Sequence, residues 1–587
     1  MAKNEQRLVR RLKWRLLGAA GVLACLASGA PAKLPGSAPV APRTDARPNL
    51  LVIMADDVGY SDLGAFGGEI DTPNLDALAA HALRFSNFQN MSRCCPSRAS
   101  LLTGRYPHKV GMAGNGTSLS RNVPTVAETL RAAGYATSMV GKWHLTAATP
   151  LADPAEQLKW LNHQAYRSRD FGDTSTYPTA RGFDRFWGIV WGVADYYDPF
   201  SLVDGTTPVP SVPRGFYLTD AISDHAAAEV ARLGTGKQPY LLYLAYTAAH
   251  WPLMALDAVI RKYLPRYRAG WETIRAARYA RQVKGGLIDP RTAPLPALDT
   301  GYANNASIAW DRLTPAQRDI QVRKMATHAA MVDIMDQGIG RVITALKASR
   351  QYDNTVVLFL NDNGASPEIM VQPGYDRPSE TRDGRPIAYG EYPVGIGGEQ
   401  TMAGIGDLWA GAANTPWRYW KAESYQGGTH TPFLLSWPGH LGAREGTVVA
   451  DAAHVIDVTP TLLELAHVAA DRTTDVPIDG ISLLPALQGR PVGRGRLLYT
   501  EHYGARAVSD GRWKLVSLAP GGRRADLPWS LYDLSVDRTE TRNIARAHPD
   551  IVARLDTAWA AWAKRVGVPL RAPQTQAAPS ATPRAID

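Results

Sequence analysis

Cysteine is scarce in this chain, which has three among 587 residues, at positions 25, 94 and 95. Adjacent cysteines such as Cys94 and Cys95 rarely bridge each other, because the bond would strain the peptide between them. A disulfide framework is therefore excluded, and a chain of this length can rely on its hydrophobic core instead. The Cys94-Cys95 pair is not there to staple the fold.

An apolar run of bilayer-spanning length is lacking near the start of the chain, where it would act as an anchor. Basic residues from Arg7 to Arg15 precede the shorter apolar stretch Leu16–Ala27, and Ala30–Ala32 forms a small-residue cleavage site. This pattern predicts a signal peptide over residues 1–32. We therefore expect an exported, periplasmic protein whose mature form has no transmembrane span.

Two details of this leader leave alternatives open. Arg10-Arg11 is compatible with a twin-arginine signal, and Ala24-Cys25 resembles a lipoprotein cleavage site, so a lipid-anchored form is an alternative. Residues 33–47 follow with a composition rich in Pro and Ala, and we expect them to be a disordered linker.

The body of the chain lacks a basic block. The formal charge is +10, but residues 1–47 hold nine Lys or Arg and two acidic residues, which leaves about +3 for the rest. Nucleic-acid binding requires clustered positive charge along a surface. We therefore exclude nucleic acid as a partner.

The remaining composition is that of an ordinary soluble globular protein, with 45% hydrophobic and 20% charged residues. The length indicates one large domain and a smaller one. We place the large domain at residues 48–485, the smaller one at 486–570, and a disordered tail rich in Pro, Ala and Gln at 571–587.

Short apolar runs alternate with longer amphipathic stretches over residues 48–465, which is typical of a doubly wound α/β domain. The runs expected as buried parallel strands are Leu50–Ala55, Ala136–Val140, Tyr240–Tyr246 and Thr355–Leu360. The stretch Met325–Lys347 has apolar residues at helical spacing and predicts a helix.

The pattern changes after Pro485. Short antiparallel strands are expected in Arg496–Tyr503, Arg506–Val516 and Trp529–Val536, with turns at Asp510-Gly511 and Pro520–Gly522. A final helix from about Asp550 carries one apolar stripe. The smaller domain is therefore expected to be an α+β unit with an antiparallel sheet and a terminal helix.

Polar side chains follow each of the four predicted parallel strands. They are Asp56 and Asp57 after the first, Lys142 and His144 after the second, His250 after the third, and Asp362 and Asn363 after the fourth. Open α/β sheets bind ligands outside the carboxyl ends of their strands. We therefore expect these residues to meet at one rim of the sheet.

Each group also has a simpler explanation when taken alone. Asp56–Gly59 and Asn361–Gly364 could form turns, because Asx-Gly pairs favour them. Lys142–His144 could be a solvated loop, and His250 could be a hydrogen-bonded residue at a strand end. Their shared placement favours a functional site, and its carboxylate and carboxamide oxygens suit Ca²⁺ or Mg²⁺ and not Zn²⁺.

The run Cys94–Gly104 reads Cys-Cys-Pro-Ser-Arg-Ala-Ser-Leu-Leu-Thr-Gly. Pro96 fits the first turn of a helix, where its missing N–H would be unpaired in any case. Residue 94 is thus predicted at a helix N-terminus, where free N–H groups and the helix dipole favour an anion. The simpler explanation is a reduced cysteine pair buried at a helix start.

This run resembles the signature of type I sulfatases, Cys-x-Pro-Ser-Arg followed by Thr-Gly, a family within the alkaline phosphatase superfamily. Further motifs of that family are matched in order over residues 48–440, by Asp56-Asp57, Gly141–His144, His250, Asp362–Gly364 and Lys421 before Gly427-Gly428. The resemblance implies an alkaline phosphatase-like fold with a large mixed or parallel sheet. One departure is Gln426–His430, where the family often has Glu-Gly-Gly-x-Arg.

The resemblance also implies a role for each matched residue. A maturation enzyme would oxidise Cys94 to formylglycine, whose hydrate attacks the sulfur of a sulfate ester. One divalent cation, Ca²⁺ or alternatively Mg²⁺, would be held by Asp56, Asp57, Asp362, Asn363 and the modified Cys94. Arg98 would fix the hydrate, Lys142 and Lys421 would bind sulfate oxygens, His250 would protonate the leaving oxygen, and His144 would act as the base.

The sequence therefore predicts a sulfuric ester hydrolase of the arylsulfatase type. A phosphate or phosphonate monoester hydrolase of the same superfamily is the main alternative. An inactive sulfate-binding protein is a second alternative, which the intact set of predicted site residues disfavours.

Overall fold

The computed structural model describes residues 47–161, 170–299, 308–374, 376–469, 474–493, 495–519 and 527–568. The predicted signal peptide, the tail and the Pro520–Gly522 turn lie outside these residues, as does the linker except for Arg47. Residues from Asp45 onward belong to one compact unit.

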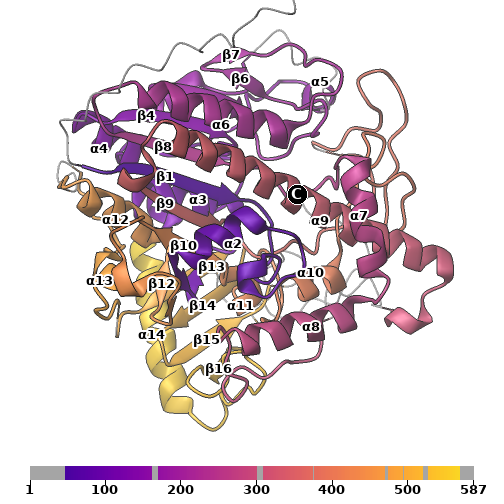
Figure 1. Ribbon diagram of the computed structural model, residues 1–587. Helices are drawn as coiled ribbons and strands as arrows, with labels where there is room; N and C mark the ends of the chain where they lie inside the picture. Colours follow the sequence, from indigo (N-terminus) through magenta and orange to yellow (C-terminus); the bar gives the residue numbers. More distant parts are fainter. Residues whose placement is uncertain are drawn as a thin grey trace, which may run out of the picture. The chain divides into compact units, whose positions relative to one another are not determined.

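A large mixed sheet forms the centre of this unit (Figure 1). Within the described residues its ten strands follow the order β11 (Val448–Val449), β2 (Ala82–Phe85), β10 (Phe433–Ser436), β9 (Thr355–Asn361), β1 (Asn49–Ala55), β8 (Tyr240–Ala245), β4 (Ala136–Gly141), β5 (Arg185–Ile189), β6 (Leu202–Asp204) and β7 (Thr207–Pro208). The five strands from β9 to β5 are parallel, whereas β10 and β6 run antiparallel to their inner neighbours.

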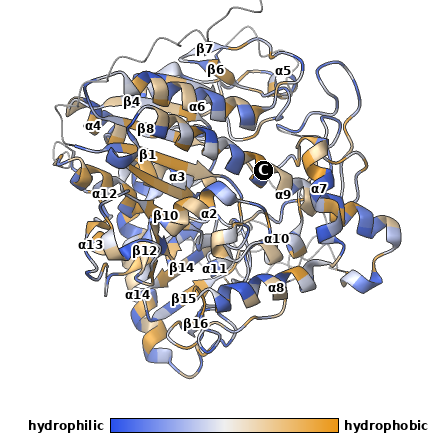
Figure 2. Cartoon of the chain, viewed as in Figure 1, coloured by the Kyte–Doolittle hydropathy of each residue, from blue (hydrophilic) through white to orange (hydrophobic). Residues whose placement is uncertain are grey.

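The four strands predicted from apolar runs are the central ones, and their parallel pairing is confirmed. Their side chains alternate between two buried layers, as a strand's period of two requires. In β1, Leu50, Val52 and Met54 pack on one face of the sheet, and Leu51 and Ile53 pack on the other. Figure 2 shows β1 largely in the orange of hydrophobic residues.

Helices cover both faces, which confirms the doubly wound α/β architecture. The hydrophobic layer on one face includes residues of α3 (Cys94–Thr103), α4 (Val126–Ala132), α5 (Pro154–Leu161), α12 (Val458–Leu465) and α13 (Leu484–Leu487), and it continues to α14 (Pro549–Val566) beside the smaller sheet. The other packs against α2 (Pro73–Ala80), α6 (Leu218–Gly234), α7 (Asp257–Tyr267), α8 (Trp271–Lys284), α9 (Pro315–Ala348) and α10 (Asp407–Ala413).

The long helix α9 contains the predicted stretch Met325–Lys347 but begins ten residues earlier, at Pro315. Thr314 caps it, because its hydroxyl accepts from the Gln317 N–H while the Gln317 side chain accepts from the Thr314 N–H. This capping box and the proline at the first helical position are sequence signals that periodicity alone does not use.

A separate four-stranded antiparallel sheet follows, as expected for the C-terminal region. It consists of β13 (Leu498–His502), β14 (Ala505–Ser509), β15 (Trp513–Ser517) and β16 (Ser530–Asp533) in sequential order. The predicted run Arg506–Val516 divides into β14 and β15 around the Asp510-Gly511 turn, and α14, in yellow in Figure 1, packs on these two strands. Two short strands, β3 (Phe88–Gln89) and β12 (Ala453–His454), pair apart from both sheets.

Candidate active site at the carboxyl ends of the central strands

The two cysteines lie at the first turn of α3, as predicted. Cys94 is the first residue of the helix, Pro96 the third, and Gly104 ends it in the left-handed conformation at φ 69°. Both thiols are buried and neither forms a disulfide. Residue 94 therefore lies where the unpaired N–H groups of a helix start are available to an anion.

Oxygen-bearing side chains from β1 and β9 meet beside this helix start. Asp56, Asp57, Asp362 and Asn363 are all fully buried or nearly so. Arg98, one turn along α3 from Cys94, donates to Asp362 Oδ2 at 2.7 Å and to Asp56 Oδ2 at 3.2 Å. The sheet thus brings four of the five predicted metal ligands together beside the fifth, Cys94, with Arg98 between two of them.

One oxygen on each of three of these residues has no partner. They are Asp56 Oδ1, Asp362 Oδ1 and Asn363 Oδ1, buried and without a hydrogen bond in the described structure. Leaving such groups unpaired in the interior is costly. Three buried hard oxygens without donors, on residues that follow the neighbouring strands β1 and β9, fit a Ca²⁺ or Mg²⁺ ion.

The fourth predicted ligand, Asp57, is already engaged. Its Oδ1 accepts from Asn363 Nδ2 at 2.6 Å, and its Oδ2 lies 2.9 Å from Lys421 Nζ and 3.7 Å from His250 Nε2. These contacts place Lys421 and His250, from distant parts of the chain, against the same carboxylate.

The acidic residues of the site differ in their ease of ionisation. Burial raises the pKa of Asp57 to about 7 in spite of Lys421, and burial also raises the pKa of Asp362 well above its usual value. Burial acts in the same direction on Asp56, but Lys142, His250 and Arg98 outweigh it and lower its pKa. Without a cation, the cluster holds more carboxylate than its surroundings favour.

Lys142 and His144 follow β4 and reach the same place. Lys142 Nζ forms an ion pair with Asp56 Oδ2, and the Lys142 carbonyl oxygen accepts from Arg98 Nη1 at 3.0 Å. A ring nitrogen of His144 and the sulfur atoms of Cys94 and Cys95 lie within 4.8 Å of one another. Burial lowers the pKa of His144 to about 4, so its imidazole is neutral at physiological pH.

His250 is held in one tautomer. Its Nδ1 lies 2.7 Å from the Trp251 carbonyl oxygen, which only accepts, so Nδ1 carries the proton. Burial, followed by the charges of Lys421 and Lys142, lowers the pKa of His250 to about 3. Its Nε2 therefore presents a lone pair toward Asp57 in this state.

Backbone strain accompanies these residues. Asp57, Ser92 and His144 all have φ near 58°, in the left-handed region that non-glycine residues rarely occupy. Such conformations cost free energy and concentrate at functional sites. Here they occur directly after β1, just before α3 and after β4, where side chains are turned into the site.

Sequence reasoning missed two charged residues at this site, Arg93 and Glu368. Arg93 Nη1 donates to Glu368 Oε1 at 3.0 Å, and Lys421 Nζ lies 3.3 Å from Glu368 Oε2. Each is adjacent to a recognised motif, since Arg93 precedes Cys94 and Glu368 follows Asp362 by six residues. The signal was proximity along the chain, but their pairing depends on the tertiary fold.

Residues Gln426–His430, which differ from the family motif Glu-Gly-Gly-x-Arg, pack within the fold. His430 is buried, its Nε2 lies 2.8 Å from the Ser86 carbonyl oxygen, and its ring stacks on Trp417 at 4.5 Å. A Cβ atom at Gly427 would lie 2.0 Å from the Tyr419 carbonyl oxygen, so glycine is required there. This turn, α11 (Gln426–Thr429), is tied to the segment that precedes Lys421, because the Gly427 N–H donates to the Arg418 carbonyl oxygen at 2.7 Å.

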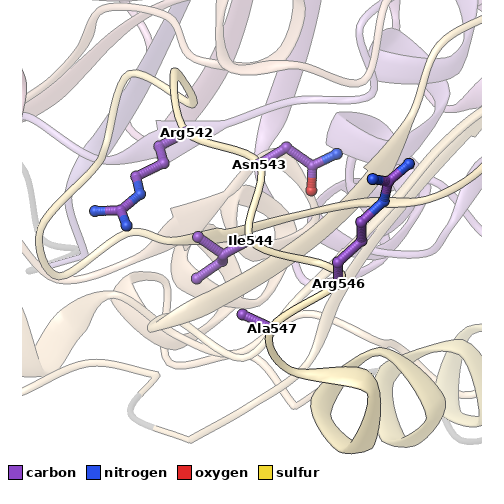
Figure 3. A pocket seen from close by; sticks show the side chains of 5 residues that line it. All are labelled: Arg542, Asn543, Ile544, Arg546 and Ala547. Carbon is purple, nitrogen blue, oxygen red and sulfur yellow. The ribbon is translucent and has the colours of Figure 1, made fainter.

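A hollow of about 470 Å³ lies elsewhere, next to the start of α14. It is lined by Arg542, Asn543, Ile544, Arg546 and Ala547, none of which belongs to the site described above. Figure 3 shows the side chains of Arg542 and Arg546 pointing away from each other, so they do not converge on one anion. We assign no role to this hollow.

Comparisons with known proteins agree with this geometry. Residues 48–468 match the family model described as Sulfatase, and residues 417–561 match the model of the N-sulphoglucosamine sulphohydrolase C-terminal region. An uncharacterized sulfatase of Schizosaccharomyces pombe is 30% identical over 89% of this chain and 94% of its own length. The arylsulfatase of Klebsiella aerogenes is 33% identical over 74% of this chain and 91% of its own.

Solved structures support the fold. The structure of Ps i-CgsB bound to a neocarrahexaose has a TM-score of 0.60 and 23% identity, covering 88% of this chain and 92% of that one. The PsFucS1 sulfatase from Pseudoalteromonas sp. has a TM-score of 0.56 and 18% identity, covering 89% and 91%.

Proposed function

This chain belongs to the sulfatase family, whose members are sulfuric ester hydrolases, and we propose that it hydrolyses aryl sulfates through a formylglycine at position 94. The observation that carries the proposal is the position of Cys94. It lies at the start of α3, against His144 and beside the buried oxygens of Asp56 and Asp362. In this interpretation the Cys94 thiol occupies the place of the formylglycine hydrate.

The chemistry proceeds as a displacement followed by an elimination. One hydroxyl of the hydrate loses its proton and attacks sulfur, the bond from sulfur to the ester oxygen breaks, and the leaving oxygen receives a proton. The second hydroxyl then loses its proton, the carbon–oxygen bond to the sulfate breaks, and the aldehyde is restored. A serine could not complete this cycle, because its sulfate ester has no second hydroxyl.

The charged residues have distinct parts in these steps. Lys142 and Lys421 neutralise sulfate oxygens, and Arg98 orients the hydrate. His144 is suited to take the proton of the second hydroxyl, because its low pKa keeps it neutral beside residue 94. His250 is assigned as the acid that protonates the leaving oxygen. This role requires that its Nε2 first receive a proton.

A divalent cation fits the unpaired oxygens of Asp56, Asp362 and Asn363, with Asp57 completing the set. When bound, Ca²⁺ or Mg²⁺ would favour the ionised hydrate and offset charge on the sulfuryl group. Chelation should abolish turnover, and readdition of Ca²⁺ or Mg²⁺ should restore it.

We also propose export to the periplasm and modification by a formylglycine-generating enzyme. The first rests on the predicted signal peptide and the second on the motif at Cys94. Among the described residues, no helix is both long and apolar enough to cross a membrane.

Mass spectrometry tests the central proposal. In protein produced with a maturation system, the peptide that contains residue 94 should carry an aldehyde at Cys94 and a thiol at Cys95. Hydrolysis of 4-nitrophenyl sulfate should fall by at least roughly 10⁴-fold in Cys94→Ala. The matched Cys95→Ala variant should retain most activity, and the reverse pattern would sink the assignment.

A further inference from the structure

A carboxylate that is not among the predicted metal ligands lies beside the same site. Glu368 Oε2 accepts from Trp251 Nε1 and from Ser366 Oγ, each at 2.8 Å, and its Oε1 accepts from Arg93 Nη1 at 3.0 Å. Its side chain is 13% exposed. Three donors thus fix this carboxylate in a single orientation.

The neighbours of Glu368 belong to the catalytic region. Arg93 directly precedes Cys94, Trp251 directly follows His250, and Lys421 Nζ lies 3.3 Å from Glu368 Oε2. Glu368 and Asp57 also line the same small cavity. Although burial opposes ionisation, Lys421 and Arg93 hold the pKa of Glu368 well below its usual range, so the side chain is anionic.

Several ion pairs surround Cys94. They join the side chains of Arg93, Arg98, Lys142 and Lys421 to the carboxyl groups of Asp56, Asp57, Asp362 and Glu368. Among these four carboxyl groups, Glu368 contacts two cations and has no unpaired oxygen, so it is not needed as a ligand of the predicted metal ion.

We propose that Glu368 and Arg93 act in opposite directions on the selectivity of the site between sulfate monoesters and phosphate monoesters, and that their balance keeps this selectivity where it is. A sulfate monoester has one negative charge at neutral pH, whereas a phosphate monoester, whose second pKa is about 6, has nearly two. The two esters are close in shape, so charge is the property by which a site separates them. The Glu368 carboxylate disfavours the second charge, and Arg93 limits that effect.

The expected size of the change in selectivity follows from Coulomb's law. At an effective dielectric constant of about 20, a unit charge that acts over an assumed separation on the order of 7 Å changes the phosphate-to-sulfate preference by roughly 10- to 50-fold. This inference rests on the proposed sulfatase activity, which the unaltered protein tests separately through its turnover of 4-nitrophenyl sulfate.

Three variants test the proposal by the direction in which each one changes the selectivity for phosphate over sulfate esters. The measurement is the ratio of kcat/KM for 4-nitrophenyl phosphate to kcat/KM for 4-nitrophenyl sulfate at pH 8, with the formylglycine content of each protein measured by mass spectrometry. Glu368→Gln should raise this ratio by roughly 10- to 50-fold, and Arg93→Gln should lower it by a similar factor. The double variant, which restores the net charge but not the ion pair, should return the ratio to within about threefold of the original.

Glu391→Gln is the matched control. Its carboxylate pairs with buried Lys324 at 2.8 Å, and that pair includes none of the residues around Cys94. It should leave the ratio unchanged. Parallel losses on both esters in Glu368→Gln, or ratios that move in the same direction in both single variants, would overturn the proposal and leave the pair a purely structural role. Absence of sulfate hydrolysis in the unaltered protein would instead refute the proposed function.

Discussion

Two clusters of buried charged residues lie at opposite ends of one loop, residues 56–62, and they differ in how completely their polar atoms are hydrogen-bonded. The first is the site around Asp56, Asp57 and Asp362. The second, here called the support cluster, consists of Asp62, Glu69, Arg278 and His328. Both are almost entirely buried, so burial alone does not distinguish them.

The distinction lies in hydrogen bonding. In the support cluster Asp62 accepts from Arg278 Nη1 and His328 Nε2, each at 2.7 Å, and from the Gly59 N–H at 2.8 Å. Arg278 uses its remaining donors on both oxygens of Glu69. In the site, by contrast, Asp56, Asp362 and Asn363 each retain an unpaired oxygen.

The pKa values follow the same division. Burial opposes ionisation of Asp62, but His328 and Arg278 outweigh it and lower the pKa; Arg278 does the same for Glu69. Burial prevails at Asp57 and Asp362, whose pKa values are raised. A satisfied cluster needs no further partner and is costly to break, whereas the unpaired oxygens of the site fit the proposed cation.

The largest expected effect is on activity, in Asp362→Asn. Hydrolysis of 4-nitrophenyl sulfate should fall by roughly 10³-fold or more, because a cation ligand is lost. In EDTA the free energy of unfolding should change much less than turnover does, because burial disfavours the Asp362 carboxylate and the neutral amide of Asn avoids that cost. Thermal unfolding with and without CaCl₂ checks the metal: a full Ca²⁺-dependent shift in this variant would contradict the assigned ligand set.

The next effect is on stability, in Arg278→Met. Removing this cation takes from Asp62 and Glu69 the buried guanidinium that they share, and the free energy of unfolding should fall by about 3–5 kcal/mol. Turnover per folded molecule should stay within about threefold, because no unpaired site oxygen is involved. Urea unfolding and rate measurements below the transition test both statements.

Arg281→Met is the matched control for that change. Arg281 lies on the same helix, α8, and also contacts Glu69, but its side chain is 42% exposed. Its loss should cost less than about 1 kcal/mol. If Arg278→Met instead abolished turnover while the protein remained folded, the support cluster would belong to the catalytic machinery.

The location of the site could largely be predicted from the sequence, because its polar residues directly follow recognisable apolar strands. Apolar runs identify β1, β4, β8 and β9, and parallel strands present their carboxyl ends at one rim, so residues such as Asp57 and His250 meet there. The support cluster was not predictable in this way. Asp62, Arg278 and His328 come from a loop and two helices, and no local pattern distinguishes them from solvated charges.

The sheet's outer parts also escaped prediction for physical reasons. β11, β2 and β7 have two to four residues, too few to show a period of two. β10 enters antiparallel between β9 and β2, and strand order across a sheet is a tertiary property. The Arg93–Glu368 pair belongs to the same class, since its members are 275 residues apart.

A third prediction concerns the two histidines at the site. His250→Ala should slow hydrolysis of esters with poor leaving groups by roughly 10²–10⁴-fold and should spare activated aryl sulfates part of that loss. His144→Ala should instead accumulate a sulfated intermediate at residue 94, visible by mass spectrometry. Equal losses on good and poor leaving groups in His250→Ala would transfer the acid role to Lys421, whose pKa Asp57 and Glu368 raise in spite of burial.

The smallest expected effect concerns how the free energy of unfolding of the metal-free protein depends on pH. The two clusters should contribute to this dependence with opposite signs. The pKa of Asp57 rises from 3.8 to about 7 on folding, so between these values the folded state keeps a proton that the unfolded state loses. Its contribution to stability therefore falls as pH rises from about 4 to 7, by up to about 1.4 kcal/mol per pH unit. Asp62 and Glu69 have the opposite sign, because their lowered pKa values give stability that is present above pH 4 and lost as pH falls below it.

This difference can be measured by unfolding at pH 5 and pH 7.5. In EDTA, the unaltered protein should lose stability between these values, and Asp57→Asn should lose less because the titrating group is gone. Ca²⁺ should stabilise the unaltered protein more at pH 7.5 than at pH 5, since the ion binds the ionised carboxylate. A pH slope that is the same in Asp57→Asn would place the buried proton elsewhere and remove the electrostatic contrast between the two clusters.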